Sequence, residues 1–356
     1  MASTVTTCYR NLSLEDRNQI LTSNGNRRAA ETPISKRVTV RNETLIGGAL
    51  SDKLEQNQKP ARLPMISIVI PAHNEASVIA RTLTAITRDA ASGEIDVIVA
   101  CNGCTDRTAS IARSFGPPVR VIETDVASKT LALNLGDQAA STFPRAYVDA
   151  DVVITIHTIR ALASRLERMD VLAVAPVPII DLDHCSWFVR SYFGVRSELP
   201  SAQEGIGGSG VYALSATGRS RFQEFPELTA DDGYIRIQFS PEERETIRFV
   251  NSTVFAPRTI KDLILIRTRA YYGTLELARR FPELWKNRGE SNHKSVIKLI
   301  RSPSQWFGVA MYLVVNIIAR YRAKRQVYKR NFTWERDSSS RRCVVAASRD
   351  CRGPTS

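Results

Sequence analysis

Two carboxylates stand two residues apart where an apolar run ends, in the stretch AYVDADVVI at residues 146–154. In an extended chain the side chains at i and i+2 point to the same side, so Asp149 and Asp151 can present oxygen atoms to one site. Hard divalent cations such as Mg²⁺ and Mn²⁺ take such ligands, often one or two carboxylates completed by substrate phosphates. Taken alone, an Asp-x-Asp pair is more typical of a turn after a strand, but its place in the predicted fold favours the cation.

Regular patterning begins with MISIVIPAHNE, where apolar runs start to alternate with helical patterns. The runs that predict strands cover residues 66–70, 95–100, 119–124, 146–151 and 171–180. The helices predicted between them cover residues 76–90, 108–115, 129–140 and 156–168. This β-α alternation predicts an α/β fold with a mainly parallel sheet flanked by helices. Ligands of such sheets bind at the carboxyl ends of the strands, which here lead into the loops PAHNE, CNGCTD and DAD.

The order of several motifs adds a resemblance to a known family. ISIVIPAHNEASVIARTL, VIVACNGCTDRTASIA, SKTLALNLGDQAA and YVDADVVI follow one another at fitting intervals. Together they resemble the nucleotide-sugar half of a family 2 glycosyltransferase with the GT-A fold. GGSGVYALSATGRSRF and LTADDGYIRIQF resemble the acceptor half, so the likeness covers about residues 65–270. The resemblance implies an inverting transfer of one sugar from a nucleoside-diphosphate sugar to an acceptor hydroxyl.

The resemblance also assigns the donor side of the site. The loop that opens at Pro71 would hold the nucleoside, with Glu75 reaching towards the ribose. NGCTD matches the family's DGSTD loop, a contact to the base, but Cys101 and Asn102 replace two aspartates. Because an asparagine amide both donates and accepts hydrogen bonds, the identity of the base stays open. The donor-binding residues implied in this way are Pro71, Ala72, Glu75, Asn102, Asp106, Lys129 and Asp149.

The charged residues around the diphosphate and the acceptor follow from the same resemblance. Lys129 matches a lysine near the nucleotide, where a fixed cation would help to hold the diphosphate. Asp149 and Asp151 form the metal pair: Asp151 would ligate Mn²⁺ or Mg²⁺ directly, and Asp149 would contact the ribose or the water shell of the cation. Asp232 aligns with the catalytic base of the family and Asp231 with the acid before it.

Two further groups are implied on the acceptor or diphosphate side. In the loop of Gly207, Gly208, Ser209 and Gly210, the missing side chains of the glycines would let the backbone approach the sugar or the acceptor, although a merely flexible loop is an open alternative. Arg267 and Arg269 stand roughly where the family often carries basic residues that face the diphosphate. The Q-x-x-R-W element of processive polymerases is absent from the sequence, which favours transfer of a single sugar.

The charge of the chain limits its partners. The 356 residues are 43% hydrophobic and carry a net charge of +13, with a pI near 9.7. Such an excess favours an anionic partner. Six basic and no acidic residues lie between Arg320 and Arg330, but the aromatic interleaving or module signature of a nucleic-acid-binding protein is missing, so no nucleic acid is expected. The lone C-x-x-C of Cys101 and Cys104 is interpreted as small packing residues.

The apolar run WFGVAMYLVVNIIA, residues 306–319, precedes this basic stretch. A helix of that length spans roughly 21 Å, short of the about 30 Å of a bilayer core. It suits a helix that lies in an anionic cytoplasmic leaflet, and a buried core helix with a solvated basic end fits equally well. Because the N-terminus lacks an apolar h-region, we expect a cytoplasmic protein, peripheral on the inner face of the cell membrane.

The pattern divides the chain into four parts. We expect a polar, flexible extension, a GT-A catalytic domain with a nucleotide-sugar half and an acceptor half, a helical segment that is a candidate for membrane association, and a flexible tail. In that order, the parts cover residues 1–62, 63–257 (halves 63–155 and 156–257), 258–330 and 331–356.

The leading hypothesis is a metal-dependent hexosyltransferase that acts on a lipid-linked or cell-surface polysaccharide precursor. A sugar-phosphate nucleotidyltransferase shares the sheet architecture, but it would need a glycine-rich basic phosphate loop after the first strand, and PAHNEAS lacks one. A non-enzymatic, membrane-bound scaffold is the third hypothesis. The presence of Asp149, Asp151 and Asp232 argues against it, because a chain without activity has no need to keep all three.

Overall fold

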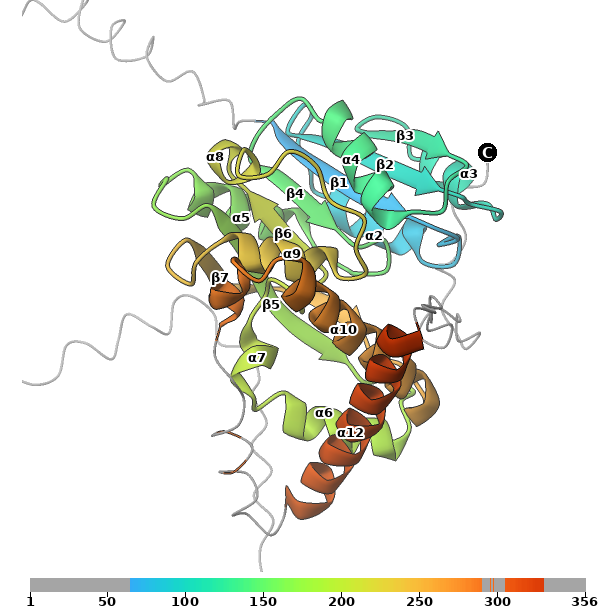
Figure 1. The fold of residues 1–356 in the computed structure, drawn as a ribbon. Coiled ribbons are helices and arrows are strands. Elements are labelled where there is room, and N and C mark those ends of the chain that lie inside the picture. The colour runs from blue at the N-terminus through green and yellow to red at the C-terminus, as the bar shows by residue number, and fades with distance from the viewer. Residues whose placement is uncertain (1–64, 290–294, 296, 298–304, 330–356) are drawn as a thin grey trace, which may run out of the picture. The chain divides into compact units, whose positions relative to one another are not determined.

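The computed structural model describes residues 65–289, 295, 297 and 305–329. The predicted extension 1–62 and the predicted tail 331–356 lie outside the described residues. A seven-stranded sheet forms the centre of the described part (Figure 1). Its strands are β1 (Ile66–Ala72), β2 (Ile95–Asn102), β3 (Val119–Thr124), β4 (Arg145–Val148), β5 (Ala173–Asp181), β6 (Val211–Leu214) and β7 (Arg244–Phe255).

The strand order is β3-β2-β1-β4-β6-β5-β7. Strands β3, β2, β1 and β4 run parallel, as do β5 and β7, so the predicted mainly parallel sheet is confirmed. The exception is β6, which is antiparallel to both of its neighbours, β4 and β5. The sequence analysis did not predict β6, because its four residues are too short to show a period. Its insertion separates β4 from the predicted fifth strand.

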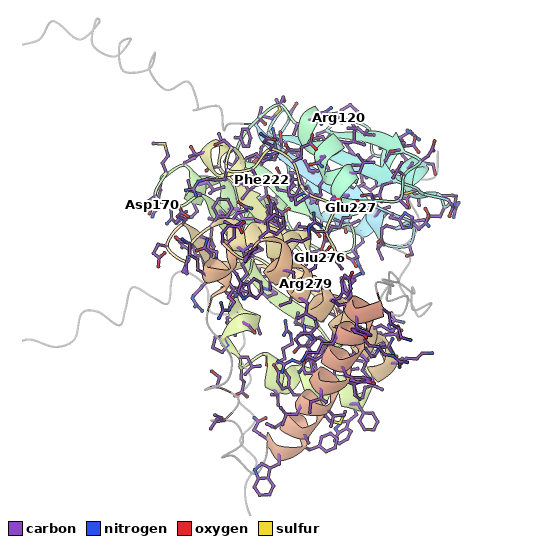
Figure 2. The ribbon with its side chains drawn as sticks, in the orientation of Figure 1. Arg120, Asp170, Phe222, Glu227, Glu276 and Arg279 are labelled. Carbon is purple, nitrogen blue, oxygen red and sulfur yellow. The ribbon has the colours of Figure 1, made fainter. Side chains whose placement is uncertain are left out.

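Alternation along the strands explains how both faces of the sheet are covered. Ile66, Ile68 and Ile70 of β1 pack in one apolar cluster, and Val69 between them packs in another. Helices α2 (Ile79–Thr87), α3 (Thr108–Arg113) and α5 (Ile156–Leu166) contribute to the first cluster, and α4 (Lys129–Ala139), α9 (Asp231–Gln238) and α10 (Ile260–Arg280) to the second. A Cβ atom on Gly136 of α4 would lie 2.4 Å from Val69 Cγ1, so the glycine lets this helix lie close against β1. Figure 2 shows the side chains that fill the space between the elements.

The helices have the following bounds: α2 Ile79–Thr87, α3 Thr108–Arg113, α4 Lys129–Ala139, α5 Ile156–Leu166, α6 Trp187–Arg196, α7 Pro200–Gln203, α8 Ala216–Arg219, α9 Asp231–Gln238, α10 Ile260–Arg280 and α12 Trp306–Lys329, with a 3₁₀ turn, η1, at Trp285–Arg288. Helices α6, α10 and α12 pack together around a third apolar cluster that includes Tyr192, Leu263 and Val315. Within the described residues, no helix combines the length and apolar character that crossing a membrane requires.

The predicted helix 306–319 is the first part of α12, which continues through the basic stretch to Lys329. Residues such as Val315 and Ala319 are buried against α6 and α10, whereas Val314 and Ile317 are exposed. One face of this helix is thus buried, as the core-helix hypothesis predicts, and the opposite face is exposed; its contact with a membrane stays a prediction.

Candidate active site

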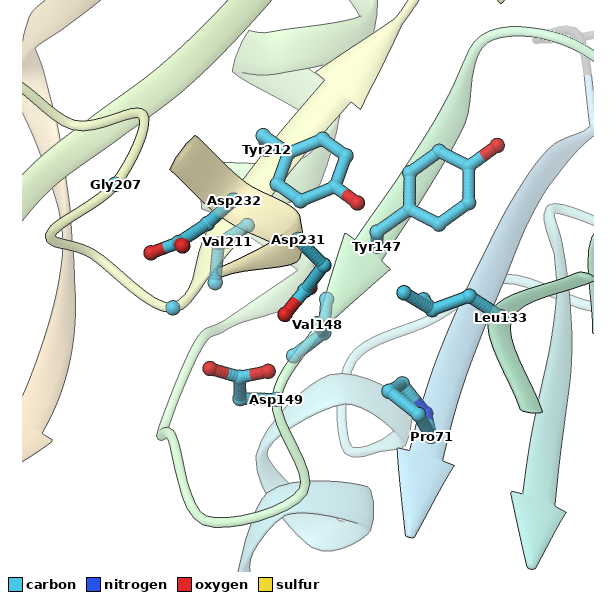
Figure 3. A pocket seen from close by; sticks show the side chains of 11 residues that line it. Pro71, Leu133, Tyr147, Val148, Asp149, Gly207, Val211, Tyr212, Asp231 and Asp232 are labelled. Carbon is cyan, nitrogen blue, oxygen red and sulfur yellow. The ribbon is translucent and has the colours of Figure 1, made fainter. Parts of the chain in front are cut away.

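A small pocket, with a cavity volume of about 10 Å³, opens where β1 and β4 end and β6 begins (Figure 3). Because β1 and β4 are parallel, their carboxyl ends meet at the same edge of the sheet. The antiparallel β6 starts at that edge and places the loop before it in the same pocket. The lining residues are Pro71, Leu133, Tyr147, Val148, Asp149, Gly207, Gly210, Val211, Tyr212, Asp231 and Asp232.

An ammonium group bridges two carboxylates at the edge of this pocket. Lys129 Nζ lies 2.8 Å from Asp149 Oδ1 and 3.0 Å from Asp231 Oδ1. Lys129 is the first residue of α4, where the helix dipole repels a cation, so the two carboxylates supply the attraction that holds it. Asp231 and Asp232 open α9, where the dipole favours anions. The bridge thus joins the donor half of the predicted site to the acceptor half.

The charges of this cluster shift one another's proton affinity. Burial would lower the pKa of Lys129, but the surrounding carboxylates of Asp149, Asp231 and Asp232 outweigh it and raise the pKa. Lys129 therefore stays charged at neutral pH. Burial raises the pKa of Asp149, and the nearby carboxylates of Asp231 and Asp151 add to this, while Lys129 opposes it. Three carboxylates thus surround one ammonium group. The pocket therefore keeps an excess of negative charge, which a further cation can balance.

Asp149 depends on a glycine for its position. The N–H of Asp149 donates to the carbonyl of Gly210 over 2.8 Å. Gly210 has a φ of +64°, and a Cβ atom there would lie 2.5 Å from Val152 Cγ2 and 3.2 Å from Asp149 Oδ2. Only glycine satisfies both the backbone conformation and the space.

Asp151 lies outside the lining of the pocket. Strand β4 ends at Val148, and residues 150–151 form a turn, so the predicted extended geometry does not apply to the Asp149–Asp151 pair. The main-chain carbonyl of Asp151 accepts a hydrogen bond from Arg81 over 2.9 Å. Its carboxylate is still close enough to Asp149 to raise the pKa of that residue. Among the described residues, no group of three or more His, Cys, Asp or Glu side chains is placed to hold a metal ion on its own.

The two predicted nucleoside loops are tied to each other. Asn102 Nδ2 donates to the carbonyl of Ala72 over 3.0 Å. Asp106 accepts from the N–H of Ala76 over 3.1 Å and from the N–H of Thr108 over 2.9 Å. The N–H of Glu75 in turn donates to Thr108 Oγ1 over 2.7 Å. These bonds give Asn102 and Asp106 a positioning role in the structure, and their contacts to a nucleotide stay predictions.

The acceptor-side residues separate into two groups. Asp232 lines the pocket and accepts the N–H of Gly233 at 2.7 Å. Gly207 also lines it, and a Cβ atom there would come within 4.0 Å of Asp232 Oδ2. Ser209 is fully buried, and its hydroxyl bonds to the main chain of Val211, so its side chain stabilises the loop. Neither Ser209 nor the neighbouring residue 208 lines the pocket.

The two predicted arginines lie on α10 and do not line the pocket. The guanidinium of Arg267 lies 5.0 Å from the ring of Tyr271, and its buried Nε has no hydrogen-bond partner. Tyr271 bonds to Asn316 of α12 over 2.8 Å. Arg267 thus lies among the C-terminal helices. The predicted diphosphate contacts of Arg267 and Arg269 remain untested.

Two tyrosines of the pocket were missed by the sequence analysis. Tyr147 of β4 and Tyr212 of β6 are paired across the strands and stacked with their ring centroids 4.9 Å apart. Tyr147 donates to Asp137, whereas the buried hydroxyl of Tyr212 has no hydrogen-bond partner among the described residues. Burial raises the pKa of Tyr212 far above its usual value, so this hydroxyl is a neutral donor open to a ligand. The unpredicted strand β6 explains why the pattern gave no signal for it.

The fold and the site together define a class of protein: an α/β protein with an acidic pocket at the carboxyl edge of its sheet. Residues 67–211 match the family model described as Glycosyl transferase family 2. Residues 67–211 therefore belong to glycosyl transferase family 2, as the resemblance predicted, and the predicted α/β fold with a mainly parallel sheet is confirmed.

Relatives match shorter stretches. The chain is 32% identical over 98 residues to validoxylamine A glucosyltransferase of Streptomyces hygroscopicus subsp. jinggangensis, covering 26% of this chain and 23% of the relative. It is 38% identical over 91 residues to 4,4'-diaponeurosporenoate glycosyltransferase of Staphylococcus aureus, covering 24% of each. The chain thus spans about a quarter of the length of these relatives.

Solved structures resemble longer parts of the chain. A mannosyltransferase from Pyrobaculum calidifontis in complex with GDP-Man and Mn²⁺ is 19% identical, with a TM-score of 0.49, over 79% of this chain and 80% of that one. Glucosyl-3-phosphoglycerate synthase from Mycobacterium tuberculosis with Mn²⁺ and UDP is also 19% identical, with a TM-score of 0.46, over 67% and 86%.

Removing the bridging ammonium should change how stability depends on pH. In Lys129→Met, Asp149 and Asp231 lose their counter-ion, which should cost about 1–3 kcal/mol because Asp149 is partly exposed and solvent screens the loss. The folded-state pKa of Asp149, already raised, rises further, so the variant should gain stability as the pH falls towards the ordinary aspartate pKa of about 4. Urea unfolding at several pH values measures both effects.

The wild-type protein is the reference for this series. The raised pKa of Lys129 means that its contribution is complete below the unfolded-state pKa and is lost only in strong alkali. The wild type should therefore gain less on acidification than the variant. The ion pairs of Lys129 would be contradicted if the wild type and the variant had the same free energy of unfolding and the same dependence of it on pH.

Proposed function

We propose that the protein transfers one sugar, with inversion, from a nucleoside-diphosphate sugar to an acceptor hydroxyl. The observation that supports this most is the carboxylate cluster around Lys129, which joins Asp149 after β4 to the start of α9 within a glycosyl transferase family 2 domain. The pocket has a donor side and an acceptor side, as a two-substrate reaction needs. Its edge position matches where open α/β sheets bind their ligands.

On the donor side, Lys129, which is paired with Asp149 and Asp231 of the pocket, is proposed to hold the diphosphate. A phosphate oxygen would compete with Asp149 and Asp231 for the ammonium hydrogens, so donor binding would replace one ion pair with another. The hydroxyl of Tyr212 offers a further hydrogen bond to the donor from the wall of the pocket. The nucleoside is proposed to lie on the loops at Pro71–Glu75 and Asn102–Asp106.

The residues present fit a divalent cation in type and charge. The ionisable groups that line the pocket are carboxylates and tyrosines, without His or Cys, and the carboxylates outnumber the ammonium group beside them. Such oxygen donors suit Mn²⁺ or Mg²⁺, with the diphosphate completing the coordination. We assign Asp149 and Asp151 as its ligands. When bound, the cation would neutralise charge on the departing nucleoside diphosphate.

On the acceptor side, Asp232 is the proposed base. Its carboxylate lines the pocket at the start of α9 and accepts the N–H of Gly233. The acceptor O–H proton passes to Asp232 as the oxygen attacks the anomeric carbon. The bond from that carbon to the diphosphate breaks at the same time, and the nucleoside diphosphate leaves with the electron pair. Holding both substrates in line supplies much of the remaining acceleration.

The acceptor is proposed to be a lipid-linked or cell-surface polysaccharide precursor, met by a peripheral enzyme at the inner face of the membrane. This finer assignment is supported by the exposed apolar residues of α12. Transfer of a single sugar is supported by the absence of the processive Q-x-x-R-W element from the sequence.

The role of Asp232 can be separated from donor binding. Asp232→Asn removes the proton acceptor but keeps the shape of the pocket, so transfer should fall about a hundredfold to ten-thousandfold while donor affinity changes little. A screen of several nucleotide sugars with Mn²⁺ first identifies the donor, and calorimetry then measures its affinity. Asp125→Asn, at an exposed aspartate after β3, is the matched control. Undiminished transfer by Asp232→Asn would remove this residue from the mechanism.

The cation assignment has a readout independent of turnover. Electron paramagnetic resonance of Mn²⁺, titrated with and without a nucleoside diphosphate, should show binding that the diphosphate strengthens. Asp151→Ala should weaken that binding about tenfold or more and abolish metal-dependent turnover. The same titration with Asp125→Ala should give the wild-type curve, because Asp125 is exposed after β3 and does not line the pocket. Transfer that persists in excess chelator would refute a required metal.

A further inference from the structure

Helix α12 is apolar on two opposite faces. Its buried face packs on α6 and α10 and consists of Val309, Tyr312, Val315, Asn316, Ala319 and Ala323. Its exposed apolar residues are Trp306, Phe307, Leu313, Val314, Ile317, Ile318 and Tyr321. They recur at intervals of three and four, which places them along one stripe of a helix. Side chains project from the helix along its whole length (Figure 2).

The stripe continues onto α6. Trp187 stacks on Phe307 with the ring centroids 4.3 Å apart, and Phe188 meets Trp187 edge to face at 5.5 Å. All three side chains are exposed, with 60% of Trp187 open to solvent. We call the stripe of α12 together with Trp187 and Phe188 the apolar face. It joins elements that are more than a hundred residues apart in the chain.

A continuous apolar surface of this kind is uncommon on a protein that meets only water. Ile317 in the middle of the stripe is 63% exposed, and Tyr321 at its end is 66% exposed. The buried face of α12 already satisfies the packing needs of the helix, so the fold itself does not require the apolar face. Trp and Tyr at its margins are the side chains enriched where protein meets both lipid and water.

The charge next to the apolar face identifies its partner. Helix α12 contains no acidic residue, and exposed Arg320, Lys324, Arg325 and Lys329 follow the apolar stripe. Lys324 and Arg325 come seven residues after Ile317 and Ile318, which is about two helical turns, so they continue the same stripe. An apolar stripe that passes into a basic one fits a bilayer surface with anionic headgroups. A second copy of this basic helix would meet charge repulsion instead.

We propose that the apolar face binds the surface of an anionic bilayer, with α12 lying in the plane of the membrane. The apolar side chains enter the boundary between headgroups and acyl chains, and Lys324 and Arg325 contact the anionic headgroups. A helix of 24 residues is about 36 Å long, so it presents several turns to the lipid at once. This binding does not depend on the proposed sugar transfer, because none of these residues lines the pocket.

Co-flotation of the full chain with lipid vesicles tests the proposal. Vesicles of phosphatidylcholine with an equal amount of phosphatidylglycerol should bind the protein, and phosphatidylcholine alone should bind it much less. Val314→Ser/Ile317→Ser should weaken binding about tenfold or more, because the lost apolar area no longer enters the lipid. Lys324→Gln/Arg325→Gln should weaken binding to the anionic vesicles about fivefold per residue. Added salt should reduce that difference.

Matched control variants replace an exposed apolar side chain and an exposed basic side chain outside the apolar face. Phe249→Ser removes a side chain that is 80% exposed on β7, and Arg168→Gln removes an exposed charge after α5, so both should bind vesicles as the wild type does. Thermal melting confirms that each variant is folded. The proposal fails if the wild type binds neither vesicle, or if the controls lose as much binding as the variants. It also fails if light scattering shows a dimer that only Val314→Ser/Ile317→Ser dissociates.

Discussion

The candidate site depends on the ammonium group of Lys129. This group lies between Asp149, which follows β4, and Asp231, which opens α9, so a single cation connects segments about eighty residues apart. Without it, Asp149, Asp231 and Asp232 would repel one another in a pocket that burial already makes unfavourable for charge. With it, the cluster still carries more carboxylates than cations. This remaining negative charge is the physical basis of the proposed divalent-cation site.

The order of the strands brings these groups together. If β5 were the neighbour of β4 in the sheet, the loop before β6 would lie elsewhere, and Gly210 could not accept the N–H of Asp149. The antiparallel β6 instead begins where β4 ends, and Tyr147 and Tyr212 face each other in the register of this pair. The same reversal brings the Gly207 loop close to Asp232. A four-residue strand therefore positions both the glycine that shapes the site and the tyrosine hydroxyl open to a ligand.

Much of this arrangement was predictable from local patterns. The alternation of Ile66, Ile68 and Ile70, followed by an amphipathic helix, gave β1 and α2, and parallel strands imply that the loops at their carboxyl ends meet. The pairing of β6 was not predictable, because it depends on contacts with two strands distant in sequence and not on a period of its own. Strand β4 also ends earlier than predicted, at Val148, and the turn at residues 150–151 follows it. The apolar run of α12 does not indicate which face of the helix is buried, because that depends on the packing of α6 and α10 against it.

The structure of the full chain with a nucleoside diphosphate and Mn²⁺ bound would test the central claim most directly. The account predicts a phosphate oxygen within hydrogen-bond distance of Lys129 Nζ, with the ion between the diphosphate and the carboxylates after β4. A nucleotide found at another surface, or a diphosphate in the pocket that leaves Lys129 bound only to Asp149 and Asp231, would contradict it.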